Sequence, residues 1–453
     1  MASSPTTLAR FREEPIQALT QAPRTETEQD CVESNTILAG TDPAHEARSR
    51  PVVAVVGVGY IGSHLAEAFA RSYDVIAFDI SRHRVEQLAR EFHGLSVRST
   101  LRAADLAAAD VFLIAVPTSL NHDRTVNITS IEKAIQTITE HARHGVMVVM
   151  ESSVAVGTTR QLLSPLIASK NVKVCMSPER VDPGRKFPAF QAIPKIISGI
   201  DSASLDAIRL LYEPVFDHLV PVSSLEVAEM TKLYENCQRM VCAAYANEMA
   251  DACASLGISG WEVSQAAASK PFGYLPFQPG AGVGGHCIPV NPYYLLQTCD
   301  MPILKHATES SWRRPFEIVN RLVQVLERKR GGATGTTRSH LSSTRKTRVL
   351  VIGVAFKRGQ SGLYNSPGVA AIQFLLRDHH LDVEFADPLV GQEALSYVPK
   401  LDTSVNWNKE SLERFDGILV TMDQVGLDMD LLGELDRVVV HDYSPRPHPL
   451  AKP

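Results

Sequence analysis

The chain has 453 residues, of which 44% are hydrophobic and 21% are charged, and its formal net charge is −5. This composition is typical of a soluble globular protein of about two to four domains, and the acidic balance gives no reason to expect nucleic acid as a partner. No apolar run approaches the roughly 18 residues of a membrane span. The scattered cysteines, without a CxxC pair, favour reduced thiols and a cytoplasmic location, with neither a disulfide framework nor a metal site.

Residues 1–50 are rich in Thr, Ser, Ala, Glu and Pro and lack periodicity, which predicts a disordered tail. Arg10 and Arg12 leave a transit peptide as the alternative, although such peptides avoid acids such as Glu13. We expect folded structure to begin at Pro51.

Residues 51–203 alternate between strand and helix patterns. The run Val52–Gly62 predicts a buried strand, a tight glycine turn and a helix start, and Ser130–His141 predicts a helix. Further strands are predicted at Val75–Asp79, Val111–Val116 and Val146–Met150. Strands that alternate with helices at this spacing indicate a parallel, doubly wound, Rossmann-like sheet.

Residues 204–330 are predicted to form a helical central domain. The segment Leu225–Leu256 has no Gly or Pro and ends at Gly257, as expected of one long helix. Such a helix could join two domains and pack against a second subunit, and a plain core helix is equally compatible. Trp312–Arg330 predicts a further helix.

A second α/β domain is predicted at residues 348–453, after a flexible Gly/Ser/Thr-rich linker at 331–347. Arg348–Lys357 repeats the strand-and-glycine pattern of the first domain. The other predicted elements are a helix at Val369–Arg377 and strands at Val383–Ala386, Gly417–Val420 and Arg437–Val440. The fold class is therefore α/β, with two Rossmann-like parallel-sheet domains joined by a helical domain with a long helix.

Gly57, Gly59 and Gly62 form a GxGxxG motif between the first strand and helix, and Asp79 closes the second strand. The glycines permit a tight turn, close approach of a pyrophosphate and close helix–strand packing. Asp79 can accept hydrogen bonds from a ribose 2′-hydroxyl and would repel a 2′-phosphate, which favours NAD over NADP. The alternative is a glycine turn that binds nothing.

Cys287 follows four glycines in the run Pro279–Leu295. The sparse side-chain bulk lets a substrate approach the thiol, as a nucleophile requires, but the same run is compatible with a glycine-rich turn and an incidental cysteine. His286 invites a Cys–His dyad, which we reject because adjacent residues generally point apart.

Several motifs together resemble the UDP-glucose/GDP-mannose dehydrogenase family of NAD-dependent nucleotide-sugar 6-dehydrogenases. The resemblance extends from Pro51 to Tyr443. Two motifs, SPERVDPG and GVGGHCIPVNPYYL, are most similar to the branch that oxidises UDP-N-acetylhexosamines. In chain order the motifs are GVGYIG, VPTS (Val116–Ser119), ESSVAVGTTR (Glu151–Arg160), SPERVDPG (Ser177–Gly184), EMTKLYENC (Glu229–Cys237), GVGGHCIPV (Gly282–Val290) and GVAFK (Gly353–Lys357).

The resemblance implies a four-electron oxidation of a sugar C6 alcohol to a carboxylate. Cys287 matches the nucleophile that carries the thiohemiacetal and the thioester. Lys232 and Asn236, which share one helix face, match the oxyanion donors, although a polar surface face would have the same spacing. Glu179 matches a residue that positions water or substrate, and Asn291 stands at a further catalytic position.

The resemblance also implies binding sites for NAD and for a UDP-sugar, and a homodimer formed through the central helix. The cofactor residues are Gly57, Gly59, Tyr60, Ile61, Gly62, Asp79, Arg84, Pro117, Thr118 and Ser153. The substrate residues are Glu179, Arg180, Lys232, Asn236, Gly284 and Lys357, with a surface ion pair as the alternative for Glu179 and Arg180. The C-terminal domain is expected to bind the nucleotide.

The chain departs from the family pattern near the expected site. Asn291 replaces an aspartate that supports the general-base step. Ser361 and Gly362 replace two acids, Tyr364 replaces an arginine, and Ser444 replaces a basic residue, for which Arg446 is a possible substitute. We therefore also consider slow turnover, an enzyme that stalls at the thioester, an unusual substrate, or a pseudoenzyme that only binds NAD and nucleotide sugar. A simpler β-hydroxyacid-type dehydrogenase would lack the third domain.

Overall fold

The computed structural model describes residues 50–121, 123–185, 187–331 and 346–445. The predicted tail lies outside the described residues except for Arg50, and so does most of the predicted linker. The same holds for Arg446.

The first sheet has eight strands in the order β10-β9-β8-β7-β4-β1-β2-β3. Its strands are parallel except for the antiparallel pair β8 and β9. The sequence predicts only β1, β2, β4 and β7, because β3, β8 and β9 each begin or end with a polar residue or glycine and β10 has only three residues. The bounds are β1 Val52–Val56, β2 Asp74–Phe78, β3 Val97–Thr100, β4 Val111–Ile114, β7 Met147–Met150, β8 Lys173–Met176, β9 Lys195–Gly199 and β10 Leu219–Pro221. A hairpin of β5 (Ser119–Leu120) and β6 (Val126–Asn127) follows β4.

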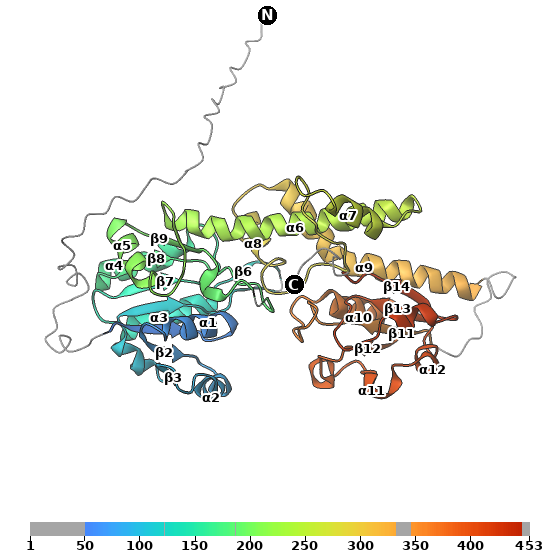
Figure 1. The fold of residues 1–453 in the computed structure, drawn as a ribbon, viewed down its shortest axis with the longest axis horizontal. Helices are drawn as coiled ribbons and strands as arrows, with labels where there is room; N and C mark the ends of the chain where they lie inside the picture. The colour runs from blue at the N-terminus through green and yellow to red at the C-terminus, as the bar shows by residue number, and fades with distance from the viewer. Residues whose placement is uncertain (1–49, 122, 186, 332–345, 446–453) are drawn as a thin grey trace, which may run out of the picture. The chain divides into compact units, whose positions relative to one another are not determined.

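Helices cover both faces of this sheet. Successive side chains of a strand point to opposite faces, and in β1 both sets are hydrophobic, so each face needs a covering layer. Val53 and Val55 pack with α1 (Tyr60–Phe69), α2 (Arg82–Glu91) and α5 (Ser202–Tyr212). On the other face, the remaining side chains of β1 pack with α3 (Thr129–His141), α4 (Thr158–Lys170) and the start of α6 (Figure 1). This confirms the doubly wound prediction. The unit continues through β10, beyond the boundary expected near residue 203, because α5 packs on β8 and β9.

The central region contains α6 (Leu225–Ser255), α7 (Gly260–Ala268), α8 (Asn291–Leu296) and α9 (Pro302–Gly331). The long helix α6 begins where Ser224 accepts a hydrogen bond from the Val227 backbone N–H. Its residues Leu233 and Met240 pack against α8 and the start of α9. Helix α9 begins earlier than the predicted Trp312, and it continues through Pro315.

The second sheet has the order β12-β11-β13-β14, and its pairings are parallel. Helices α9 and α10 cover one face, and short helical segments cover the other. The elements are β11 Arg348–Ile352, α10 Pro367–Arg377, β12 Asp382–Ala386, η3 Gln392–Leu395, α11 Thr403–Asn406, α12 Lys409–Leu412, β13 Gly417–Val420, η4 Asp430–Glu434 and β14 Val439–Asp442. Two further 3₁₀ segments, η1 (Ala103–Ala108) and η2 (Phe190–Ala192), belong to the first unit. None of the described helices is both long and apolar enough to cross a membrane.

Candidate active site

The turn between β1 and α1 depends on two glycines. Gly57 has φ +87°, a conformation that side chains other than glycine rarely adopt, and its N–H donates to the Phe78 carbonyl at 2.9 Å. A Cβ atom at Gly62 would lie 2.0 Å from the Gly57 carbonyl oxygen. Both residues therefore shape the turn and its packing.

Gly59 lies at the N-terminus of α1 and has a different environment. A Cβ added there would meet no atom within 4 Å, and no side chain caps the first turn of the helix. Tyr60 and Ile61 follow it in that turn. The helix start thus leaves room for a pyrophosphate beside backbone N–H groups and the positive end of the helix dipole.

Asp79 is held firmly beside this turn. Its carboxylate accepts the Val58 N–H and the Ser81 N–H, each at 2.9 Å. Arg84 donates from Nε to the Val58 carbonyl at 2.7 Å. Because each carboxylate oxygen can accept more than one hydrogen bond, Asp79 keeps acceptor capacity for ribose hydroxyls. The residues of the turn therefore fit a dinucleotide.

Pro117, Thr118 and Ser153 follow the carboxyl ends of β4 and β7, which are neighbours in the sheet. The Ser152 hydroxyl donates to the Val116 carbonyl at 2.8 Å and links the two strand ends. The cofactor residues predicted from sequence therefore lie along one edge of the sheet, where ligands of doubly wound folds bind.

Cys287 lies just before α8, and its carbonyl accepts the Asn291 N–H at 2.9 Å. Burial raises the pKa of the Cys287 thiol, while the positive charge of Lys232 acts in the opposite direction. Lys232 is 3% exposed, and its Nζ lies 3.5 Å from Oε2 of Glu179. The loop after β8, helix α6 and the Cys287 turn thus converge on one position.

Asn236 and Asn291 are both buried and in contact. The Asn236 amide donates to Oδ1 of Asn291, and the guanidinium of Arg239 donates to Oδ1 of Asn236. Arg239 also lowers the pKa of Cys287. Arg239 is not among the site residues predicted from the sequence, although its spacing of three residues from Asn236 indicates the same helix face.

Two further cations expected to bind substrate have protein partners. Arg180 pairs with Glu235 of α6 at 2.5 Å and donates to the Pro194 carbonyl at 2.9 Å. Lys357 pairs with Asp182 at 2.6 Å and donates to the Pro183 carbonyl at 2.8 Å. A residue of the second α/β domain therefore contacts the loop that carries Glu179.

The glycine-rich run before Cys287 packs against the same domain. A Cβ atom at Gly284 would lie 2.8 Å from Cβ of Phe356. The Gly285 N–H donates to the Tyr364 carbonyl at 2.8 Å. The His286 ring stacks on the Tyr364 ring, with centroids 3.7 Å apart. Tyr364, one of the departures from the family pattern, thus packs directly beside the cysteine turn.

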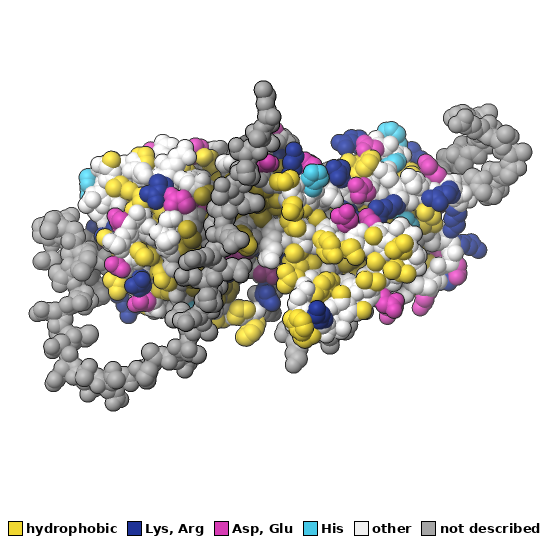
Figure 2. Space-filling model, turned by 90° about the horizontal axis from the view of Figure 1, so that it is seen from above, with side chains coloured by type: hydrophobic (Ala, Val, Ile, Leu, Met, Phe, Trp, Pro, Cys, Tyr) yellow, Lys and Arg dark blue, Asp and Glu magenta, His cyan; other side chains and the backbone are white. Residues whose placement is uncertain are grey.

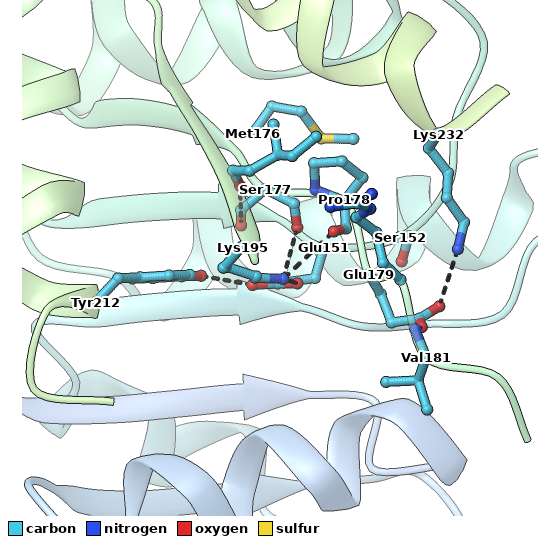
Figure 3. A network of polar contacts seen from close by, with 12 residues as sticks. Glu151, Ser152, Met176, Ser177, Pro178, Glu179, Val181, Lys195, Tyr212 and Lys232 are labelled. Carbon is cyan, nitrogen blue, oxygen red and sulfur yellow. Dashed lines mark hydrogen bonds and ion pairs between the residues drawn. The ribbon is translucent and has the colours of Figure 1, made fainter. Parts of the chain in front are cut away.

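A buried polar network behind Glu179 was not foreseen. Lys195, Glu151 and Tyr212 contact one another beneath the loop at residues 177–179 (Figure 3). Only Glu151 belongs to a motif quoted from the sequence. Among the described residues, no group of three or more His, Cys, Asp or Glu is arranged to hold a metal ion.

The open helix start at Gly59 and the Asp79 carboxylate that follows β2 fit the dinucleotide site of a Rossmann-type oxidoreductase. The NAD-binding-domain model of the UDP-glucose/GDP-mannose dehydrogenase family matches residues 52–216, and the central-domain model matches residues 226–311. The chain belongs to this family, and its cofactor is NAD.

Named relatives are similar over most of their length. A UDP-N-acetyl-D-glucosamine 6-dehydrogenase of Pseudomonas aeruginosa is 30% identical, over 75% of this chain and 83% of the relative. A UDP-N-acetyl-D-mannosamine dehydrogenase of Methanocaldococcus jannaschii is 27% identical, over 74% of this chain and 78% of the relative. The solved structure of a UDP-D-ManNAc dehydrogenase from Pyrococcus horikoshii superposes with a TM-score of 0.75 at 25% identity, covering 88% of this chain and 97% of that one.

Proposed function

We propose that the protein oxidises the C6 alcohol of a UDP-sugar to a carboxylate in two NAD-dependent steps. The relatives named above act on UDP-N-acetylhexosamines, which supports that class ahead of UDP-glucose. The observation that carries the proposal is the convergence of Cys287, Lys232 and Glu179 in a chain whose first sheet carries an NAD-binding domain. Bound NAD accepts a hydride in each of the two oxidations.

The residues take distinct roles in this proposal. The first oxidation removes a hydride from C6 and a proton from its hydroxyl, which leaves an aldehyde. The Cys287 thiolate then forms a C–S bond to C6. Lys232 and the free N–H of the Asn236 amide donate to the oxygen of this thiohemiacetal. Loss of the second hydride from C6, together with the proton on this oxygen, leaves a thioester.

Water then attacks the thioester carbon, the C–S bond breaks, and the products are the sugar acid and the Cys287 thiol. Glu179 is the residue that orients water or a sugar hydroxyl. Asn291 stands close to this step, but an amide cannot take up a proton. This substitution favours a second candidate, an enzyme or pseudoenzyme that turns over slowly or stops at the thioester.

The chain also carries features expected of a homodimer. Hydrophobic side chains gather on the face that carries α6 and α7 (Figure 2). Tyr234 and Leu256 are 71% and 74% exposed, and other exposed hydrophobic residues of these helices are Val227, Tyr245, Met249 and Val263. Exposed apolar patches of this kind mark interaction surfaces. We propose pairing through the central helix, and a cytoplasmic location on the basis of the dispersed free cysteines.

A panel of UDP- and GDP-sugars incubated with NAD tests the function. We expect two NADH per sugar and a uronic acid product with a UDP-N-acetylhexosamine. A binding protein would release none, and a simple alcohol dehydrogenase would release one. Cys287→Ser is expected to abolish the acid, and Cys299→Ser, which changes an exposed thiol, serves as the control. Acid formed at the parental rate by Cys287→Ser would exclude the proposed mechanism.

A further inference from the structure

Three polar side chains without an assigned role are buried behind the candidate active site. Glu151 follows β7, Lys195 begins β9, and Tyr212 ends α5. Their exposed fractions are 1%, 5% and 0%. We refer to these residues as the buried triad (Figure 3).

The triad is closely connected. Nζ of Lys195 lies 2.5 Å from Oε2 of Glu151, and the Tyr212 hydroxyl donates to Oε1 of Glu151 at 2.5 Å. Burial raises the pKa of Glu151, and the charge of Lys195 opposes this effect. A buried ion pair contributes little net stability, because desolvation offsets the attraction between its charges. Stability alone is therefore a weak reason for its presence.

The triad also holds the loop that carries Glu179. Lys195 Nζ donates to the carbonyls of Ser177 at 3.2 Å and Pro178 at 3.4 Å. Together with Glu151, these acceptors match the three N–H donors of an ammonium group. The Glu179 N–H donates to the Glu151 carbonyl at 3.4 Å. The loop is therefore attached to two members of the triad, through Lys195 and through the backbone of Glu151.

We infer that the buried triad positions Glu179 against Lys232 for the oxidation of the sugar. This inference rests on the proposed function. Glu151, Lys195 and Tyr212 are positioning residues that act through the loop at 177–179, and they do not touch substrate. A planar guanidinium cannot direct three donors as an ammonium does, so Lys195→Arg is not a conservative change here.

Two variants and one control test the inference. Glu151→Gln with Lys195→Met removes both charges together, so that no unpaired charge is buried, and leaves the two loop carbonyls without their donor. Tyr212→Phe removes only one hydroxyl and is the gentler change. Tyr73→Phe is the matched control, because the Tyr73 hydroxyl is also buried and donates to the Leu211 carbonyl at 2.9 Å, away from the loop.

We expect the double variant to lower kcat between about ten- and a hundredfold, since a small displacement of a positioning group costs that much, with the KM for NAD unchanged. Hydrogen exchange of the segment 177–181 should become faster in the double variant. Tyr212→Phe should show the same changes more weakly, and Tyr73→Phe should show neither. Tyr212→Phe decides the question if the double variant does not fold.

Unchanged exchange in the folded variants would overturn the inference, and so would faster exchange with an unchanged kcat. A parent protein that oxidises no sugar nucleotide would instead overturn the proposed function. The exchange measurement would then still decide whether the triad holds the loop.

Discussion

The thiol of Cys287 lies among charges of both signs. Lys232 and Arg239 favour its anion, while Glu179 and Asp182 disfavour it, and burial has the largest effect. The pKa of the free enzyme's thiol is therefore above its ordinary value. A bound substrate that brings further donors, or shields the carboxylates, would favour the thiolate.

The first prediction concerns the reactivity of this thiol. Alkylation of Cys287 by iodoacetamide should require a pH above the ordinary range of a cysteine thiol, because burial raises its pKa, and the exposed Cys299 serves as the control for the reagent. Lys232→Met should move the Cys287 profile to still higher pH, because removing a positive charge disfavours the anion. Peptide mass spectrometry after short pulses of reagent measures both thiols in one sample. A profile for Lys232→Met at the parental pH or below it would contradict this account.

The second prediction concerns Asn291, which is 2% exposed and accepts a hydrogen bond from Asn236. Asn291→Asp should speed thioester hydrolysis by at least about tenfold, since general bases contribute about 10²–10⁴-fold. Intact mass spectrometry after mixing with NAD and UDP-sugar should detect a covalent adduct in the parent and less of it in Asn291→Asp. Asn291→Ala is the control without an acid. Rapid parental turnover with no adduct would exclude a stall at this step.

At the scale of elements, the junction of β1 and α1 separates two roles of glycine. Gly62 faces the Gly57 carbonyl, and Gly59 faces open space. Both glycines belong to the GxGxxG motif, but only Gly59 leaves space beside it for a ligand.

The third prediction follows from this contrast. Gly62→Ala should lower the melting temperature, because overpacking typically costs about 1–3 kcal/mol. Gly59→Ala should leave the melting temperature nearly unchanged and weaken NAD binding by about tenfold or more, because its methyl group would occupy the pyrophosphate path. Thermal unfolding and calorimetric titration with NAD measure the two effects. Tight NAD binding by Gly59→Ala would contradict the proposed cofactor position.

The fourth prediction concerns the whole molecule. Light scattering should find a dimer for the parent and a monomer for Tyr245→Glu, because burying an unpaired carboxylate in an apolar interface is costly. Tyr397→Glu is the matched control, since Tyr397 is similarly exposed but lies in the second α/β domain, away from α6. If Tyr245→Glu is as dimeric as the parent, the interface lies elsewhere.

The sequence by itself determined the doubly wound fold and the long helix α6. Both depend on local signals, such as the apolar runs of β1 and β4 and the uninterrupted pattern that begins at Leu225. Its short motifs also predicted Cys287 as the nucleophile and the glycine turn as the cofactor site. Strands β3, β8 and β9 escaped prediction because each begins or ends with a polar residue or glycine, and β10 escaped because it has only three residues. Such strands are stabilised mainly by packing against their neighbours in the sheet.

Only the tertiary structure decided which side chains meet. Lys357 pairs with Asp182, and Lys195 pairs with Glu151, although each pair is far apart in sequence. Arg239 likewise becomes a candidate site residue only through its contact with Asn236 and its effect on the pKa of Cys287. Sequence periodicity reports which face of an element is buried, whereas the partner of a buried charge depends on how whole elements pack, because distant segments must first come together.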